Sequence, residues 1–312
     1  MRRHLPLMIT AAVFLAGFLF CALSFRHFAS AGTILGLLTD GAYLGIVAAG
    51  MTFVIISGGI DLSVGSVIGF TTVFLALAIQ QGVPPLAAFA AALAICAAFG
   101  AAMGALIHFV DLPPFIVTLA GMFLARGAAL LLSTESLPIQ SPLYDALAGK
   151  VPWFMLAVFA AGAILLHFTR FGAVVYALGG GRHTTALMGV KVGGPTIRVY
   201  LLSSLLAGTA GIVFSLYTGS GNALAATGVE LDAIAAAVIG GTLLSGGVGS
   251  MAGTFLGVLI EGLVQTYINF DGTLSSWWAK IATGLLLFAF IGLQQALLSR
   301  GRRPKSTDRG QK

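Results

Sequence analysis

The sequence predicts an all-α integral membrane protein, a polytopic helical bundle of about ten transmembrane spans with broken or re-entrant segments. Three observations support this fold class. Of the 312 residues, 58% are hydrophobic and only 8% are charged, whereas soluble domains carry about 25% charged residues. The apolar runs are long and lack the alternation of membrane β-barrel strands. The 42 glycines and 10 prolines are typical of transmembrane helices, where small residues let backbones approach.

The apolar runs give ten candidate spans, since a helix needs about 20 residues to cross a bilayer. In order they are Leu5–Phe25, Thr33–Ser57, Leu62–Ile79, Leu86–Val110, Phe115–Leu132, Trp153–Phe168, Val199–Thr218, Asp232–Ser245, Met251–Ile268 and Trp278–Leu298. The first exceeds the usual length of a signal-peptide core, so we expect it to be retained. The eighth is too short, so we expect a broken or re-entrant helix, or one that begins before Asp232. Residues 1–312 are expected to form a single transmembrane domain.

The placement of positive charge supports an even number of spans, because cytoplasmic loops are enriched in Lys and Arg. With the N-terminus inside, most basic residues fall on the inner side and few outside. The inner residues are Arg2, Arg3, Arg170, Arg182, Lys191, Arg198, Arg300, Arg302, Arg303, Lys305, Arg309 and Lys312; the outer ones are Arg26, Lys150 and Lys280. We therefore expect both termini in the cytoplasm, with a basic tail over residues 300–312 and no binding of nucleic acid.

The longest inner loop, residues 169–198, has a pattern of its own. Gly179–Gly181 precede a short segment, Arg182–Val190, and Gly193–Pro195 follow it. Glycine before a segment and Gly/Pro after it mark helix boundaries. The loop is therefore predicted to carry a short helix outside the bilayer.

Two glycine-rich stretches resemble each other, Gly58–Ser66 and Gly240–Ser250. Paired interruptions in two parts of a membrane protein point to a transport pathway built from repeats. Four G-x-x-x-G patterns in or beside the candidate spans predict close helix packing. They are Gly41/Gly45, Gly65/Gly69, Gly100/Gly104 and Gly253/Gly257.

Motifs for catalysis are missing. The sequence contains no G-x-x-x-x-G-K-[ST] phosphate loop, no H-E-x-x-H and no G-x-S-x-G. Cys21 and Cys96 lie in apolar runs and have no metal-ligand spacing. We therefore predict a protein that is not an enzyme and that has no cofactor, no metal site and no ATPase activity of its own.

Ionisable residues at membrane depth are costly and are candidates for a substrate pathway. Asp61 and Ser63 lie in a glycine-rich break; Asp61 either accepts backbone N–H groups at the start of the next helix or lines the pathway. Arg126 either snorkels to the interface or pairs with an acid. Glu261, Gln265 and Asn269 are spaced at four residues and share a helix face. This face either lines the pathway or forms hydrogen bonds between helices.

Several motifs resemble the ribose-type family of ABC sugar permeases. They are Thr52–Ser66, Ala177–Gly180 with Ala186–Val190, and Val229–Ala235 with Ile239–Gly249. The resemblance covers nearly the whole chain. Within the family, Gln265–Trp278 looks most like the second permease of galactofuranose importers.

This resemblance implies a permease of an ATP-driven sugar importer in the bacterial inner membrane. It implies three protein partners: a separate ABC ATPase, a second permease (a homologous chain or a second copy) and a periplasmic sugar-binding protein. The short inner helix would be the element that couples to the ATPase, through residues Arg182, His183, Ala186, Leu187, Met188 and Gly189. Transport would proceed by alternating access.

Two other classes of transporter remain open at this point. One is an ion- or proton-coupled secondary transporter, which would use Asp61 or Glu261 and would need no ATPase. The other is an ABC permease for branched-chain amino acids, which shares the broad fold. The isolated inner helix favours an ATPase partner, and the residue pattern of Gly58–Ser66 favours a sugar as the substrate.

Overall fold

The structure of the protein is a computed structural model that describes residues 5–275 and 277–301. Its elements are α1 (Leu5–Ser24), α2 (Ala31–Asp40), α3 (Ala42–Ile56), α4 (Val64–Gln80), α5 (Pro85–Phe109), α6 (Pro114–Leu132), β1 (Leu137–Pro138), α7 (Pro142–Ala148), α8 (Val151–Phe168), α9 (Arg170–Gly180), α10 (Arg182–Leu187), α11 (Gly193–Thr218), β2 (Ser220–Gly221), α12 (Val229–Ile239), α13 (Met251–Asp271) and α14 (Trp277–Gly301). Arg2, Arg3 and the tail from residue 302 onward lie outside the described residues. The chain is thus a helical bundle, as the sequence predicts.

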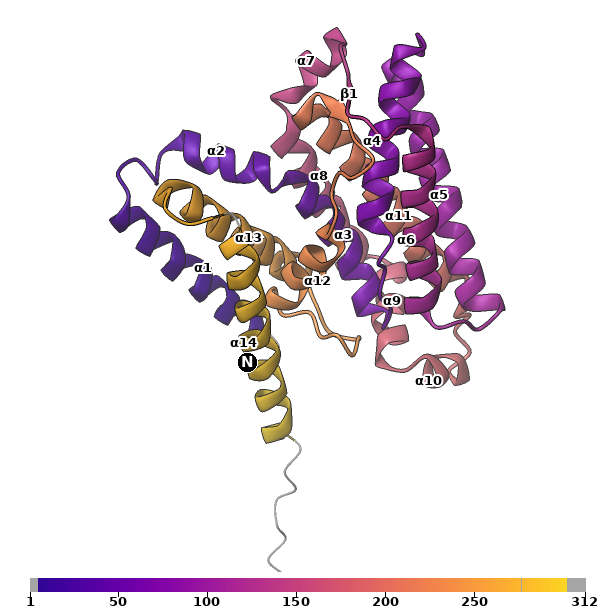
Figure 1. Cartoon of the computed structure of the whole chain (residues 1–312). Helices are drawn as coiled ribbons and strands as arrows, with labels where there is room; N and C mark the ends of the chain where they lie inside the picture. The colour runs from indigo at the N-terminus through magenta and orange to yellow at the C-terminus, as the bar shows by residue number, and fades with distance from the viewer. Residues whose placement is uncertain (1–4, 276, 302–312) are drawn as a thin grey trace, which may run out of the picture.

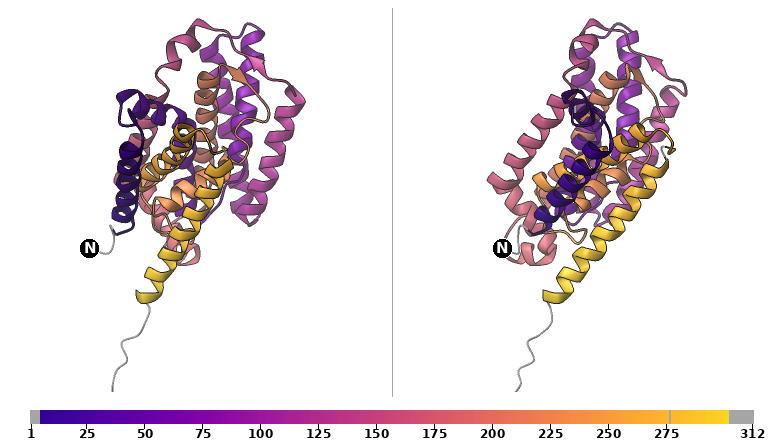
Figure 2. Two further views of the ribbon diagram at one scale, coloured as in Figure 1. Left: turned by 60° about the vertical axis from the view of Figure 1, so that its left-hand side comes forward. Right: turned by 90° about the vertical axis from the view of Figure 1, so that its left-hand side faces the viewer.

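The helices form two groups that α3 and α12 join (Figure 1). On one side α1 and α14 pack on α13; on the other, α4 and α5 pack on α11, and α6 packs on α4. Every residue of α3 from Gly45 to Ile56 is buried. A helix that is apolar all round belongs inside a bundle, so α3 forms the centre of the core. Figure 2 shows α14 on the outside of the bundle, extending past the neighbouring helices.

The four G-x-x-x-G patterns lie at close helix contacts, as predicted. A Cβ at Gly104 of α5 would lie 2.7 Å from the Cα of Ile197 in α11, and one at Gly45 of α3 only 2.5 Å from the Met155 sulfur of α8. A Cβ at Gly257 of α13 would overlap the carbonyl group of Ala236 in α12. Small residues therefore set the spacing between these helices.

The number of helices that can cross a bilayer is smaller than expected. Among the described residues, α1, α5, α6, α8, α11, α13 and α14 are long and apolar enough, and the pair α2–α3 would be an eighth span. The candidate span Thr33–Ser57 is broken, because the chain bends by 52° between α2 and α3, at Gly41. Glycine is a common site of helix kinks. Helix α4 has 17 residues and α12 only 11, so neither of them passes the length test for a span.

Residues 169–198 are more helical than predicted. The short helix is present as α10, but it ends at Leu187. Helix α9 precedes it and was not predicted; the Thr169 hydroxyl caps it by accepting the Gly172 N–H at 3.3 Å. Gly193–Pro195, which were expected to end a helix, instead begin α11. Proline is tolerated in a first turn, where the backbone N–H groups have no partner within the helix.

The two ends of the bundle differ in what they carry. The start of α1, helix α10 and the end of α14 lie toward one end (Figure 1). Helix α7 and strand β1 lie at the other end, where β1 pairs with β2 in an antiparallel ladder of two residues. This ladder joins the loop before α7 to the segment that follows α11.

Candidate functional site

The two similar glycine-rich stretches end two helices with the same geometry. Helix α3 ends before Gly58, which has φ 84°, and α12 ends before Gly241, which has φ 93°. The Gly58 N–H donates to the Ile55 carbonyl and the Gly241 N–H to the Val238 carbonyl, each at 2.9 Å. A left-handed glycine with this bond is a Schellman helix end. The predicted end of the eighth span at Ser245 is therefore wrong, because the glycine pair stops α12 at Ile239.

The two helix breaks also touch each other. The Gly247 N–H, between α12 and α13, donates to the Ile56 carbonyl at the end of α3 at 2.9 Å. One turn away, the hydroxyls of Thr52 and Thr254 are 2.7 Å apart and link α3 to α13. The last turn of α3 is thus tied to the second break by backbone and side chain together.

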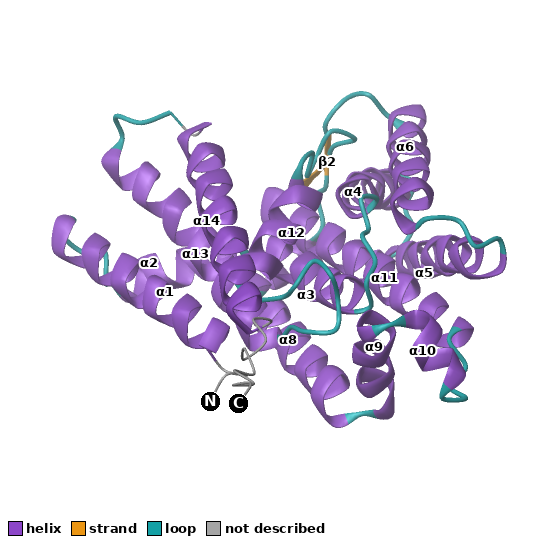
Figure 3. Ribbon diagram, turned by 90° about the horizontal axis from the view of Figure 1, so that it is seen from below, coloured by secondary structure: helices purple, strands orange, loops and turns teal. Residues whose placement is uncertain are grey.

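The glycine triplet of the inner loop meets the same place. A Cβ at Gly246 would lie 2.9 Å from the Cα of Gly179 and 3.0 Å from that of Gly58. A Cβ at Gly179 itself would overlap the Ile56 carbonyl. We call the contact of Gly58, Gly179, Gly246 and Gly247 the glycine junction. Figure 3 shows α9 beside α3, with α10 next to α9.

Tyr176 adds a side-chain bond to the glycine junction. It lies on α9, one turn before Gly179, and its hydroxyl donates to the Gly249 carbonyl at 2.7 Å. Its ring also lies against His167, with ring centroids 6.3 Å apart. Sequence analysis did not single out Tyr176, because α9 itself was not predicted.

Asp61 is fully buried in the break between α3 and α4. One carboxylate oxygen accepts the Ser63 N–H at 3.0 Å and the Ser63 hydroxyl at 2.6 Å; the other accepts the Ser203 hydroxyl of α11 at 2.7 Å. The expectation that Asp61 binds backbone N–H at the start of α4 is confirmed. Such bonds offset the cost of removing a carboxylate from water. Contact of Asp61 and Ser63 with substrate stays a prediction.

Helix α11 holds the same break through a second residue, Tyr200. Its side chain is buried, and a Cβ at Gly59 would lie 3.3 Å from its Cζ. Its hydroxyl has no hydrogen-bond partner among the described residues. The segment between α3 and α4 is therefore enclosed by α9 on one side and α11 on the other.

Backbone carbonyl groups bind Arg126, which the sequence predicts either to snorkel to the interface or to pair with an acid. Its guanidinium donates to the carbonyls of Ala223 and Ala225, the latter at 2.9 Å, in the segment between β2 and α12. A Cβ at Gly69 would lie 2.6 Å from its Nη1, so a G-x-x-x-G pattern of α4 makes room for this arginine. Arg126 thus fastens α6 to the segment that precedes α12.

The polar stripe on α13 is partly buried. Glu261 is 9% exposed, and its Oε1 has no hydrogen-bond partner in the described part of the chain. The Gln265 amide donates to Asn269 at 3.2 Å, which confirms that these two residues share a face. Within the described residues, no hydrogen bond joins the stripe to Asp61, Ser63 or Arg126. The predicted pathway residues therefore do not form a single cluster in this structure.

Helix α10 presents one fixed face and one free face. The Thr185 hydroxyl donates to the Ala177 carbonyl of α9 at 2.7 Å, and the Arg182 Nη2 lies 3.2 Å from the His108 Nδ1 of α5. On the other face Leu187 and Met188 are 75% and 76% exposed, and His183, Ala186 and Gly189 are exposed beside them. Sequence analysis missed Thr185 and His108, which hold the helix in place.

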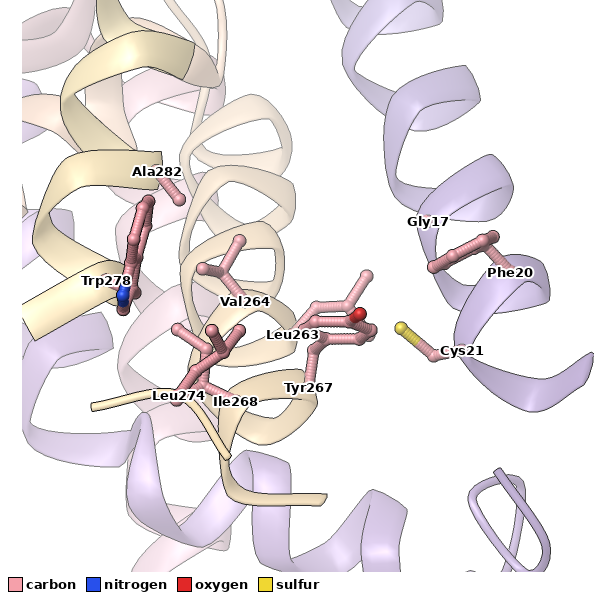
Figure 4. Close-up of a pocket in the computed structure, with 10 residues that line it drawn as sticks. All are labelled: Gly17, Phe20, Cys21, Leu263, Val264, Tyr267, Ile268, Leu274, Trp278 and Ala282. Carbon is pink, nitrogen blue, oxygen red and sulfur yellow. The ribbon is translucent and has the colours of Figure 1, made fainter. Parts of the chain in front are cut away.

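Two cavities differ sharply in character. One, of about 310 Å³, lies between α1, α13 and α14 and has an apolar lining that includes Leu263, Val264 and Trp278 (Figure 4). The other, of about 860 Å³, lies beside the glycine junction, with Tyr176 and Gly247 in its wall. Sugar recognition needs placed polar groups, which the first cavity lacks. In the described chain no three His, Cys, Asp or Glu side chains come together to hold a metal ion.

Comparison with known proteins places this arrangement in a family. Residues 33–291 match the family described as the branched-chain amino acid transport system permease component. The inner membrane ABC transporter permease protein YjfF of Escherichia coli is 58% identical over 95% of this chain and 93% of its own. The fructose import permease protein FruG of Bifidobacterium longum is 35% identical (96% and 93% covered), and the ribose import permease protein RbsC of Escherichia coli 37% (85% and 86%).

The chain belongs to the ribose-type family of ABC sugar permeases. No solved structure matches it. The permease is thus a multi-pass membrane transport component.

Proposed function

We propose that the permease carries a simple sugar across the bacterial inner membrane, as one subunit of an ATP-driven importer whose termini are cytoplasmic. The observation that carries this proposal is the environment of α10. Thr185 and Arg182 hold the helix on the bundle, while the side chains of Leu187 and Met188 are exposed. Apolar side chains exposed on a well-fixed helix are typical of a protein interface. Its place on the same side as the start of α1 and the end of α14 fits a cytoplasmic partner.

A separate ABC ATPase is the proposed partner of α10. Leu187 and Met188 would enter a groove of the ATPase, and Arg182, His183, Ala186 and Gly189 would complete the contact. A second permease would pack beside this one, and a periplasmic binding protein would deliver sugar to the opposite end. Movement of the ATPases would then alternate access between the two sides. The whole chain would act as one permease domain.

A galactofuranose-like sugar is the proposed substrate, because the residues of Gln265–Trp278 resemble those of the second permease of galactofuranose importers. Glu261, Gln265 and Asn269 are the proposed pathway face, since a carboxyl and two amides suit sugar hydroxyls. Arg126 would act near the outer end, and Asp61 with Ser63 next to the inner one. The unpartnered Oε1 of Glu261 favours this face, because a buried polar atom without a partner is costly unless a ligand or water meets it.

Reconstitution of the importer tests the ATPase partnership. The permease, the ATPase, the second permease and the binding protein are placed in vesicles, and uptake of radiolabelled galactose, ribose and fructose is measured with and without ATP. Leu187→Asp is expected to abolish uptake and copurification of the ATPase, because it puts a charge in an apolar contact. The matched control is Leu224→Asp, at a residue 63% exposed in the loop before α12; it should leave the ATPase bound.

The same vesicles separate the alternatives. Sugar uptake by the permease alone, driven by a proton gradient, would make it a secondary transporter and refute the proposal. Uptake of leucine instead of any sugar by the complete, ATP-driven complex would identify an amino-acid permease.

A further inference from the structure

Helix α10 is bonded to the bundle mainly through α9, the helix that comes before it. The Thr185 hydroxyl donates to the carbonyls of Ala177 and Gly181, at 2.7 and 2.8 Å. Only Gly181 separates α9 from α10. A force applied to α10 therefore reaches the last turn of α9 within a few residues.

That last turn of α9 is where the glycine junction lies. Gly179 packs against the carbonyl of Ile56, and the same carbonyl accepts the Gly247 N–H. The backbones at Gly179, Ile56 and Gly247 thus meet with no side chain between them. Because close-packed contacts transmit displacement, a shift of one of these segments moves the others. The Tyr176 hydroxyl adds a hydrogen bond to the Gly249 carbonyl.

Both broken helices are joined at this point. Gly58 belongs to the break between α3 and α4, and Gly246 to the break between α12 and α13. Helix breaks are the places where a helical bundle can change angle at low cost. The cavity of about 860 Å³ adjoins Tyr176 and Gly247 and leaves room for such movement on one side.

We propose that α9 transmits movement of α10 to both helix breaks through the glycine junction, with Tyr176 and Gly179 as the positioning residues for transport. This inference rests on the proposed function, because it takes α10 to be the element on which the ATPase acts. The segment between α3 and α4 is the part that α9 drives, while the Asp61–Ser203 bond to α11 anchors its far end.

The coupling ratio of the complete importer tests the proposal. It is the number of radiolabelled galactose molecules taken up per ATP hydrolysed, with ribose as the probe if the unmodified importer takes up ribose instead. Gly179→Ala should lower this ratio by roughly 5- to 30-fold, since the added Cβ separates α9 from Ile56. The ATPase should still copurify, because α10 is unchanged.

Gly180→Ala is the matched control, since a Cβ there meets nothing within 4 Å in the described structure. It should leave the coupling ratio unchanged. If Gly179→Ala assembles and couples as well as Gly180→Ala, the proposal is wrong.

Tyr176→Phe decides the matter if Gly179→Ala fails to assemble. It removes the hydroxyl that reaches Gly249 and keeps the ring beside His167. The coupling ratio should fall roughly 2- to 5-fold while the amount of complex and its melting temperature stay near normal. If Tyr176→Phe lowers the melting temperature but leaves the coupling ratio unchanged, Tyr176 only stabilises the fold and the proposal is wrong. An unmodified importer that takes up no sugar would instead refute the proposed function.

Discussion

Asp61 shows how a carboxylate is accommodated where no water reaches it. All of its hydrogen bonds come from Ser63 and Ser203, and no cation pairs with it among the described residues. Two serines on different segments are thus held by one side chain. These hydrogen bonds hold the segment between α3 and α4 on α11.

Loss of this carboxylate should destabilise the permease. Asp61→Ala leaves the Ser203 hydroxyl and the Ser63 N–H without their acceptor, which costs about 2 kcal/mol. Thermal unfolding of the detergent-purified permease measures this loss. The control is Asp145→Ala, at an exposed aspartate of α7, where a change within about 0.5 kcal/mol is expected. Equal melting temperatures for the two variants would contradict the role of Asp61.

Glu261 and Gln265 make a second prediction at the scale of the residue. Glu261→Gln keeps the shape and removes the charge, and Gln265→Ala removes the amide that donates to Asn269. If this face meets sugar, each change should lower the rate of uptake about 10-fold at unchanged protein level, as the loss of one hydrogen bond to a ligand does.

Glu135→Gln, at an exposed glutamate of the loop between α6 and α7, is the control of the same chemistry. Uptake that is equal in Glu261→Gln, Gln265→Ala and Glu135→Gln would make the α13 stripe a structural feature.

Small residues govern the contacts between whole helices. Gly100 and Gly104 let α5 lie directly on the backbone of α11. Helices in membranes associate through such packing, because lipid supplies no hydrophobic driving force between them. The contact of α5 with α11 is the most extensive between any two described elements.

A methyl group should separate these two helices. Gly100→Ala brings a Cβ within 2.6 Å of the Ser204 Cβ and should lower stability by about 2 kcal/mol, as overpacking does. Gly127→Ala is the control, because nothing described lies within 4 Å of its added Cβ. Melting temperatures in detergent compare the two. A Gly100→Ala permease as stable as Gly127→Ala would mean that the α5–α11 contact is looser than described.

Sequence reasoning succeeded where one helix is defined by its own residues. The apolar runs of α5, α6 and α13 start within one residue of their predicted positions. It failed where neighbours decide the structure. Helix α9 has glycines at its end and lies outside the apolar runs, so Gly179–Gly181 indicate only the start of α10 and not the end of α9. The bend of 52° at Gly41 interrupts a continuous apolar run, so hydrophobic periodicity does not reveal it.

The candidate site could be predicted only in pieces. The resemblance between Gly58–Ser66 and Gly240–Ser250 was visible, and so was the glycine triplet. Their meeting at one point depends on contacts between segments far apart in the chain, and so does the Asp61–Ser203 bond. Tyr176 gave no signal, since a tyrosine in a loop has no spacing to interpret.

The orientation of the whole molecule makes a prediction that labelling can check. The protein has only Cys21 and Cys96, and both are buried, so an added cysteine is labelled against a low background. A membrane-impermeant maleimide should label Asp145→Cys in intact cells. It should label Met188→Cys only in inverted vesicles or opened cells, because α10 lies at the other end of the bundle (Figure 1).

The reverse pattern would invert the proposed topology. Labelling of both positions from one side would mean that the number of crossings between them is even, against the odd number that our spans require.

Helix α12 has a consequence for how the permease is made. With 11 residues it is too short to cross a bilayer by itself, and it packs on α3, α13 and α14. The insertion machinery meets α12 late in synthesis, when α3 is already in the membrane. The ribosome therefore delivers a segment that lipid alone does not retain, and we expect α12 to stay in the membrane only once it packs on the earlier helix α3.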